Sequence, residues 1–259
     1  MARRGRRWVI ALVVVVVVLG GLFVVADRVA VTMAEQRIAD EAAKEMGNRG
    51  ITSASKPQAD IAGFPFLTQV LGGTYRKVSF TVDHPRSGQV SLDRFTLVAD
   101  RVHAPLDAIT SGHGQVTADA VQGTATLGWD AVRDLVDTTP LRQVPGLDIS
   151  RLKVTVRDNK VNLAAPVAFA GINLQLEATG TLAVTGGEVH LQLDDLRAVS
   201  PTGGMAIPQS FIDQYRSQLG VKIAVPSLPY DLVVNKVETS PDGVLIIATA
   251  ANVVLAGQA

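Results

Sequence analysis

The hydrophobic pattern of the chain begins with an unbroken apolar segment, Val9–Ala26, which follows a short tail with four arginines. As a helix, its eighteen residues would extend about 27 Å, close to the hydrocarbon thickness of a bilayer. Because basic residues remain on the cytoplasmic side, we expect residues 1–8 in the cytoplasm, residues 9–26 across the plasma membrane and residues 27–259 outside the cytoplasm. The alternative is a signal peptide cleaved after Ala26, with a longer apolar region than usual and a secreted product.

A helical pattern continues directly after this segment, over residues 27–46. Its apolar positions recur at spacings of three and four, which is typical of a helix with one packed face. Gly47 is expected to end the helix. Glu35 and Asp40 fall on other faces, so the sequence predicts that their carboxylates point away from the packed side. The apolar positions are Val31, Ala34, Ile38, Ala42 and Met46.

Two β-hairpins are predicted by their turns and by the register that those turns impose. Two-residue turns at Asp158-Asn159 and Gly186-Gly187 suit this geometry, and each register places apolar side chains on one face. The expected pairs are Arg157–Lys160, Val156–Val161, Val154–Leu163 and Leu152–Ala165 in the first hairpin, and Val184–Val189 and Leu182–Leu191 in the second. The opposite face of the second hairpin would carry Asn173, Gln175, Glu177, His190, Gln192 and Asp194.

The rest of the chain beyond residue 60 is dominated by β-patterns without an obvious domain boundary. The last strand has the run Val244–Ala248, which is apolar on both faces and so would be buried on both faces or line an apolar cavity. We therefore predict an α+β fold, with one long, curved antiparallel sheet packed with a few helices. Further strands are expected at 75–82, 89–103, 114–126, 229–238 and 243–255, and short helices at 65–71, 129–137 and 208–219.

Composition narrows the function classes. Residues 27–259 carry 20 basic and 24 acidic groups, and such an acidic domain is a poor candidate for binding nucleic acid. The absence of cysteine excludes disulfides, thiolate metal sites and a thiol nucleophile. Hydrophobic residues make up 47% of the chain but aromatic residues only 5%. The apolar surface is therefore mainly aliphatic, which suits a β-sheet core and also suits acyl chains.

Catalytic and metal-binding motifs are not found in the sequence. The four histidines, at positions 84, 103, 113 and 190, lack the spacing of metal ligands, although His103 and His113 flank a stretch where a site is conceivable. Neither a G-x-S-x-G nucleophile motif nor a phosphate-binding loop is present. Carboxylates such as Asp194-Asp195 are expected to keep a sheet face solvated. We therefore expect no enzyme activity, no cofactor and no metal.

The segment Gly63–Val78 has an unusual composition, with two of the seven phenylalanines between glycines and a proline. Pro65 can open a short helix and Gly72-Gly73 can end it. One interpretation is a hydrophobic plug at the end of a sheet. The other is an apolar lip near the membrane, where Arg76 or Lys77 supplies a cation for a lipid phosphate. Adjacent residues of a strand point to opposite faces, so only one of these two cations is expected to serve a given pocket.

This segment, G-F-P-F-L-T-Q-V-L-G-G-T-Y-R-K-V, lies behind an N-terminal anchor and an exported helix and resembles the LmeA-type phospholipid-binding proteins of actinobacteria. The resemblance extends over residues 27–256. It implies a fold like that of the tubular lipid-binding (TULIP, BPI-like) proteins, in which a curved sheet wraps around helices and leaves an apolar cavity. It also implies binding of phospholipid, with an anionic headgroup, and a role in lipid or lipoglycan maintenance in the cell envelope.

The candidate lipid contacts combine this segment with the apolar face of the predicted helix at 208–219. Two alternative functions stay open at this point. A structural or scaffolding envelope protein would have a packed interior without a lipid cavity, and an envelope enzyme would need ionisable groups gathered in a cleft. The candidate residues are Phe64, Phe66, Leu67, Val70, Leu71, Tyr75, Arg76, Lys77, Phe211 and Tyr215.

Overall fold

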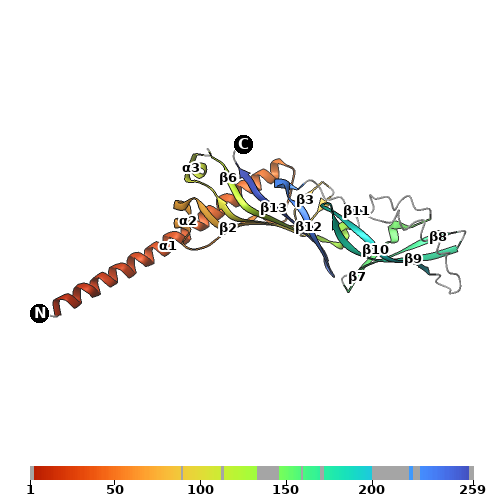
Figure 1. Cartoon of the computed structure of the whole chain (residues 1–259), viewed down its shortest axis with the longest axis horizontal. Helices are drawn as coiled ribbons and strands as arrows, with labels where there is room; N and C mark the ends of the chain where they lie inside the picture. The colour runs from red at the N-terminus through yellow and green to blue at the C-terminus, as the bar shows by residue number, and fades with distance from the viewer. Residues whose placement is uncertain are drawn as a thin grey trace.

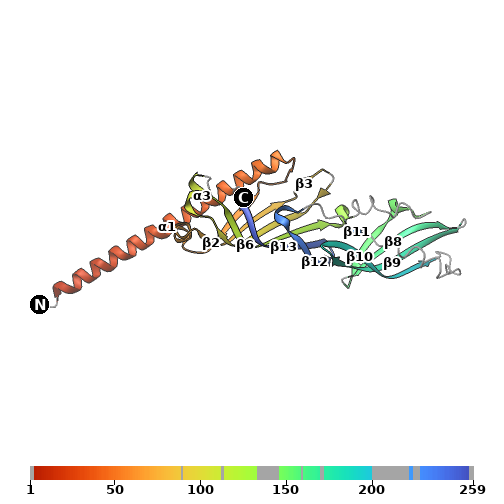
Figure 2. The ribbon, with the colours of Figure 1, turned by 45° about the horizontal axis from the view of Figure 1, so that its top comes forward.

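The protein is elongated, with a long helix leaving one end of a β-rich body (Figure 1). The computed structural model describes residues 3–88, 90–111, 114–132, 146–158, 160–169, 172–199, 222–223 and 228–256. A six-stranded sheet lies next to the helix, and a five-stranded sheet forms the other end of the body (Figures 1 and 2). The strands in both sheets pair antiparallel, which confirms the predicted α+β class. They form two sheets where the sequence led us to expect one.

Helix α1 (Arg3–Asn48) is a single helix of 46 residues. It joins the apolar segment to the expected exported helix without a break and extends for about 69 Å. By length and composition it could cross a bilayer, and the apolar side chains from Leu12 to Val25 are exposed. Beyond them, Val31 and Ala39 are buried against the body. Val31 is therefore packed as predicted, and so is the half-buried Ala34, whereas Ile38 is 38% exposed and its predicted burial was wrong.

The six-stranded sheet has the order β1-β2-β5-β6-β13-β12. After β6 the chain leaves this sheet to build the five-stranded one and then returns to add β12 and β13. The predicted strand at 89–103 is divided, because its first residues belong to a small two-stranded ribbon and not to the six-stranded sheet. Pairing with β6 begins just before β5, where the Asp93 N–H donates to Thr126 O at 2.8 Å. The strands are β1 (Gln58–Ala62), β2 (Thr74–Asp83), β5 (Arg94–His103), β6 (Val116–Gly128), β12 (Val233–Ser240) and β13 (Gly243–Ala256), and the ribbon is β3 (Arg86–Ser87) with β4 (Val90–Ser91).

The five-stranded sheet has the order β11-β10-β9-β8-β7 and contains both predicted hairpins. Val156 pairs with Val161 and Val184 with Val189, so both registers are confirmed. A bulge between Leu193 and Asp195 shifts the alternation beyond it, and Leu196 becomes buried. The strands are β7 (Lys153–Arg157), β8 (Lys160–Phe169), β9 (Ile172–Thr185), β10 (Glu188–Val199) and β11 (Lys222–Ile223).

One apolar core connects the two sheets. It includes the fully buried Val121 and Val244 of the first sheet and Val189 of the second. Strand β12 contacts β9 and β10, which places the end of one sheet against the other. Strand β13 lies between β6 and β12, and Val244, Ile246 and Ala248 on one of its faces belong to the core. Its run at 244–248 alternates buried and half-buried side chains, so a large part of it is ordinary core.

Short helical elements complete the fold. Helix α2 (Phe66–Gly72) occupies the position predicted at 65–71, and α3 (Leu106–Ser111) follows β5. A 3₁₀ turn, η3 (Pro229–Asp231), replaces the first residues of the strand expected at 229–238. A second 3₁₀ turn, η2, spans Ile149–Arg151. The helix expected at 208–219 lies outside the described residues, as does the second half of the one expected at 129–137.

Candidate functional site

Helix α2 is fixed in place by the residues at its two ends. Pro65 precedes its first turn, and the Thr68 hydroxyl donates to Pro65 O at 2.9 Å. Gly73 ends it in the left-handed conformation, with φ of 63° and its N–H directed at the last carbonyls of the helix. A side chain would be strained at this φ, and a Cβ there would lie 3.4 Å from Pro105 Cα. The predicted helix and its glycine stop are both confirmed.

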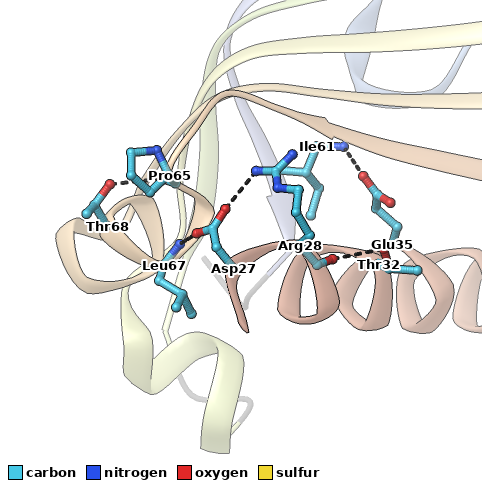
Figure 3. A network of polar contacts seen from close by, with 8 residues as sticks. All are labelled: Asp27, Arg28, Thr32, Glu35, Ile61, Pro65, Leu67 and Thr68. Carbon is cyan, nitrogen blue, oxygen red and sulfur yellow. Dashed lines mark hydrogen bonds and ion pairs between the residues drawn. The ribbon is translucent and has the colours of Figure 1, made fainter. Parts of the chain in front are cut away.

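Asp27 joins α2 to the long helix (Figure 3). It is the first residue after the apolar segment, yet none of its surface is exposed. The Leu67 N–H donates to its Oδ1 at 2.8 Å, and Arg28 Nη2 donates to its Oδ2 at 2.7 Å. Burial raises the pKa of Asp27, but the hydrogen bonds from the Leu67 and Phe66 backbone and from Arg28 outweigh it and hold the pKa below its usual value. The Asp27 carboxylate is therefore charged, and it is hydrogen-bonded where α1 meets the first turn of α2.

Two further carboxylates hold α1 along the body. Glu35 Oε1 accepts from the Ile61 N–H of β1 at 3.0 Å, as Figure 3 shows, and Asp40 forms an ion pair with Lys56 at 2.7 Å. Strand β1 is an edge of the six-stranded sheet, and a bond from a helix covers an N–H that would otherwise point to solvent. The prediction that Glu35 points away from the packed side was therefore wrong. Its partner is 26 residues away in the chain, so helical spacing alone could not reveal it.

The structure separates the predicted apolar residues of the segment 63–78 into two groups. Phe66 and Tyr75 are each 6% exposed, and their rings pack 6.1 Å apart between centroids. Burial raises the pKa of the Tyr75 hydroxyl. Phe64 is 51% exposed and Leu71 is 80% exposed, so these two present apolar surface to the outside. Leu67 and Val70 lie between the two groups and are half-buried against the core.

The two predicted cations have different surroundings. Lys77 forms an ion pair with Asp100 on the neighbouring strand, at 3.5 Å. Arg76 is exposed, and its backbone N–H donates to Gln69 Oε1 of α2 at 2.9 Å. Within the part of the chain that the structure describes, the buried Gln69 Nε2 has no hydrogen-bond partner. A Cβ on Gly63 would lie 2.8 Å from this nitrogen and 3.3 Å from Arg76 Cδ, so Gln69 and Arg76 both border the Gly63 backbone.

Arg28 is a basic residue of this site that the sequence did not reveal. Its guanidinium carbon lies 5.2 Å from the centre of the Phe64 ring, close enough for a cation–π contact. The only sign of its role in the sequence was that Asp27 and Arg28 directly follow the apolar segment. Of the remaining predicted contacts, Phe211 and Tyr215 lie outside the described residues.

A polar hollow lies at the other end of β2 and β5. Its volume is about 550 Å³, and an ion pair between Asp83 and Arg94 at 2.8 Å forms part of its wall. His84 and Asp93 line it as well. Its walls do not resemble an apolar lipid cavity. Among the residues whose positions are described, no three histidine or acidic side chains are grouped as a metal site, and His103 contacts Asp119 at 3.1 Å.

Comparison with protein families gives a match over most of the chain. A family model described as LmeA-like phospholipid-binding matches residues 25–249. The match begins at the end of the apolar segment and includes α2, the five-stranded sheet and the six-stranded sheet as far as the first half of β13. Comparisons with curated proteins and with solved structures returned no match.

Proposed function

Because the chain belongs to the LmeA-like phospholipid-binding family, we propose that it holds an anionic phospholipid at the outer face of the plasma membrane, anchored there by the first part of α1. Phospholipid binding follows from the family. The observation that carries the rest of the proposal is the continuous helix α1, which brings an apolar segment of membrane-spanning length directly to α2. The four arginines that precede it favour a cytoplasmic N-terminus, with residues 27–259 as the extracytoplasmic domain.

In this proposal the acyl chains contact the outer side of α2. Phe64 and Leu71 offer exposed apolar surface there, and Leu67 and Val70 continue it inward. Phe66 and Tyr75 form the wall behind them. Covering apolar surface is favourable by about 25 cal/mol per Å², so a few such side chains contribute several kcal/mol. From the sequence pattern alone, Phe211 and Tyr215 are proposed as further apolar contacts.

Arg76 is the better candidate for the lipid phosphate. An ion pair with Asp100 already occupies Lys77, whereas Arg76 extends from the backbone next to α2. A guanidinium can give two parallel hydrogen bonds to a phosphate, which favours an anionic headgroup. Holding a lipid in this way needs no cofactor and no catalytic group. We place the protein in lipid or lipoglycan maintenance of the cell envelope.

The test is to identify the lipid that the full chain retains. The protein is purified from its host's membranes in a mild detergent, and the extracted lipid is quantified by mass spectrometry. We expect about one anionic phospholipid per chain above the lipid that surrounds the anchor. Leu71→Glu should reduce this amount, and Val233→Glu should not, because Val233 is also exposed, at 58%, but lies on β12 at the far edge of the sheet.

The comparison between the two variants removes the contribution of lipid around the anchor, which both share. Equal lipid in Leu71→Glu, Val233→Glu and the unchanged protein would contradict the proposed contacts. If no variant and no unchanged protein retained lipid or took up added phospholipid, the proposed function would be wrong. The packed interior would then favour the alternative of a structural envelope protein.

A further inference from the structure

Three exposed apolar side chains lie at the end of the body from which α1 leaves. Leu71 of α2 is 80% exposed, Phe64 before α2 is 51% exposed, and Leu106 at the start of α3 is 49% exposed. A single exposed leucine needs no explanation, but a group beside a membrane anchor does. Figures 1 and 2 show α2 and α3 next to each other at this end of the six-stranded sheet.

Backbone contacts hold the two short helices together. The Ala104 N–H donates to Gly73 O at 2.9 Å, which joins the residue after α2 to the residues before α3. Gly73 also approaches Pro105 so closely that a Cβ would lie 3.4 Å from Pro105 Cα. Leu71 lies two residues before Gly73, and Leu106 lies two residues after Ala104. Both leucines therefore belong to the same end of the molecule.

The position of this end relative to the apolar segment is fixed by α1. Asp27 directly follows that segment, and it accepts the Leu67 N–H of α2, while Arg28 lies over the Phe64 ring. A second bond, from Ile61 to Glu35, ties the helix to β1 about 12 Å farther along, at about 1.5 Å per residue. Two such contacts on an unbroken helix fix the direction of α1 relative to the body and the point along α1 at which the body begins. The level at which α1 leaves the membrane is therefore also the level of α2.

From this placement we infer that Phe64, Leu71 and Leu106 form a docking surface that enters the outer leaflet of the membrane that α1 crosses. The inference rests on the proposed anchor. The bilayer is the occupant because the surface is continuous with the apolar part of α1 and lies at its outer end. Aromatic and aliphatic side chains suit this interface, and Arg28 can keep its guanidinium at the level of the lipid phosphates.

Apart from Arg76, which the proposed function assigns to the lipid phosphate, the basic side chains considered at this end are paired with acidic ones. Arg28 pairs with Asp27 and Lys77 with Asp100, and Arg101 contacts Asp119 at 2.6 Å. Paired charges attract an anionic surface weakly, so the apolar side chains supply most of the docking energy. Docking should consequently respond little to salt, in contrast to a polybasic surface. It would also let a phospholipid move from the leaflet to α2 without crossing water.

The chain has no cysteine, so single reporter cysteines can be placed without background. The full chain is reconstituted into nanodiscs of phosphatidylglycerol and phosphatidylcholine, with bimane on Leu71→Cys or Leu106→Cys. We expect quenching by lipids that carry a nitroxide near the headgroup, protection from aqueous iodide, and the same result at 50 and 500 mM salt. Val233→Cys is the exposed control and should be quenched by iodide alone, and Val17→Cys should show that the anchor lies in the bilayer.

The outcomes separate this inference from the proposed function. Iodide quenching at Leu71→Cys and Leu106→Cys equal to that at Val233→Cys would overturn docking, even if extracted protein still carried phospholipid. Lipid-quenched labels on a protein that retains no phospholipid would support docking and contradict lipid holding. A water-exposed label at Val17→Cys would overturn the anchor and docking together. Because Leu71 is 80% exposed and Leu106 is 49% exposed, neither replacement is expected to disturb folding.

Discussion

Replacing Phe66 or Leu71 with alanine separates the core side of α2 from its outer side. Phe66 is 6% exposed and packs on Tyr75, whereas Leu71 lies five residues farther along α2 and is 80% exposed. Both replacements remove a large apolar side chain from the same short helix, and alanine keeps the helix intact. The two variants therefore form a matched pair that differs mainly in burial.

The expected losses of stability follow from the exposed fractions. Removing a buried phenylalanine costs the transfer free energy of the ring and leaves a cavity, in total about 3–5 kcal/mol. Complete burial of a leucine is worth about 1.5–3 kcal/mol, and Leu71 retains only a fifth of its contact, so its removal should cost about 0.3–0.6 kcal/mol. For a domain of this size, about 1 kcal/mol shifts Tm by roughly 2–4 °C. Phe66→Ala should lower Tm by about 6–20 °C and Leu71→Ala by about 1–2 °C.

The assay is thermal unfolding of the full chain in detergent, followed by circular dichroism in the β-sheet region, together with quantification of retained lipid. We expect Phe66→Ala to lose stability, and Leu71→Ala to lose lipid while it keeps nearly all its stability. If Leu71→Ala lowered Tm as much as Phe66→Ala, both sides of α2 would belong to the core. The segment would then be a hydrophobic plug and not an apolar lip. If Phe66→Ala left Tm unchanged, the burial argument itself would fail.

Two other predictions concern charged groups of the site. The pKa of Asp27 is lowered in the folded protein, so its stabilising contribution is complete above its unfolded pKa of about 3.8 and is lost as the pH falls through the lower folded value. Asp27→Asn should lower Tm at pH 7 and reduce the difference in Tm between pH 7 and pH 3, measured by thermal melts with Glu35→Gln as the comparison. An unchanged pH dependence would contradict this role. Arg76→Gln should lose more anionic phospholipid than Lys77→Gln in lipid-overlay or liposome binding, because Asp100 already pairs with Lys77. Equal losses would show that the phosphate does not distinguish the two cations.

Local structure was largely predictable from the sequence, because short-range physics determines it. The hairpin at Gly186-Gly187 needed only a turn with glycines and alternating side chains to define the pairing of Val184 with Val189. Likewise, Pro65 and Gly73 mark both ends of α2 without reference to the rest of the chain. In both cases the deciding residues lie within a few positions of one another.

Tertiary partners were not predictable in the same way. Asp27 and Leu67 are 40 residues apart, and no periodicity links a carboxylate on one helix with a backbone N–H on another. The segment 63–78 gave two interpretations because sequence does not say which of Phe64 and Phe66 faces inward. The division into two sheets depends on the return of β12 and β13 to the first sheet, a connection that strand patterns leave open.

The bond between Asp27 and α2 gives a physical reason for keeping helix and domain in one chain. A buried carboxylate next to an apolar segment is costly unless hydrogen bonds satisfy it, and here backbone N–H groups and Arg28 do so. Such an arrangement fixes the angle between α1 and the body, which a flexible linker would leave free. If the protein passes phospholipid to or from the leaflet, that fixed angle keeps Phe64 and Leu71 against the membrane at no further entropic cost. Cleavage after Ala26 would instead leave Asp27 in the first turn of the helix, which frays. The same hydrogen bonds would then no longer connect the body to the apolar segment.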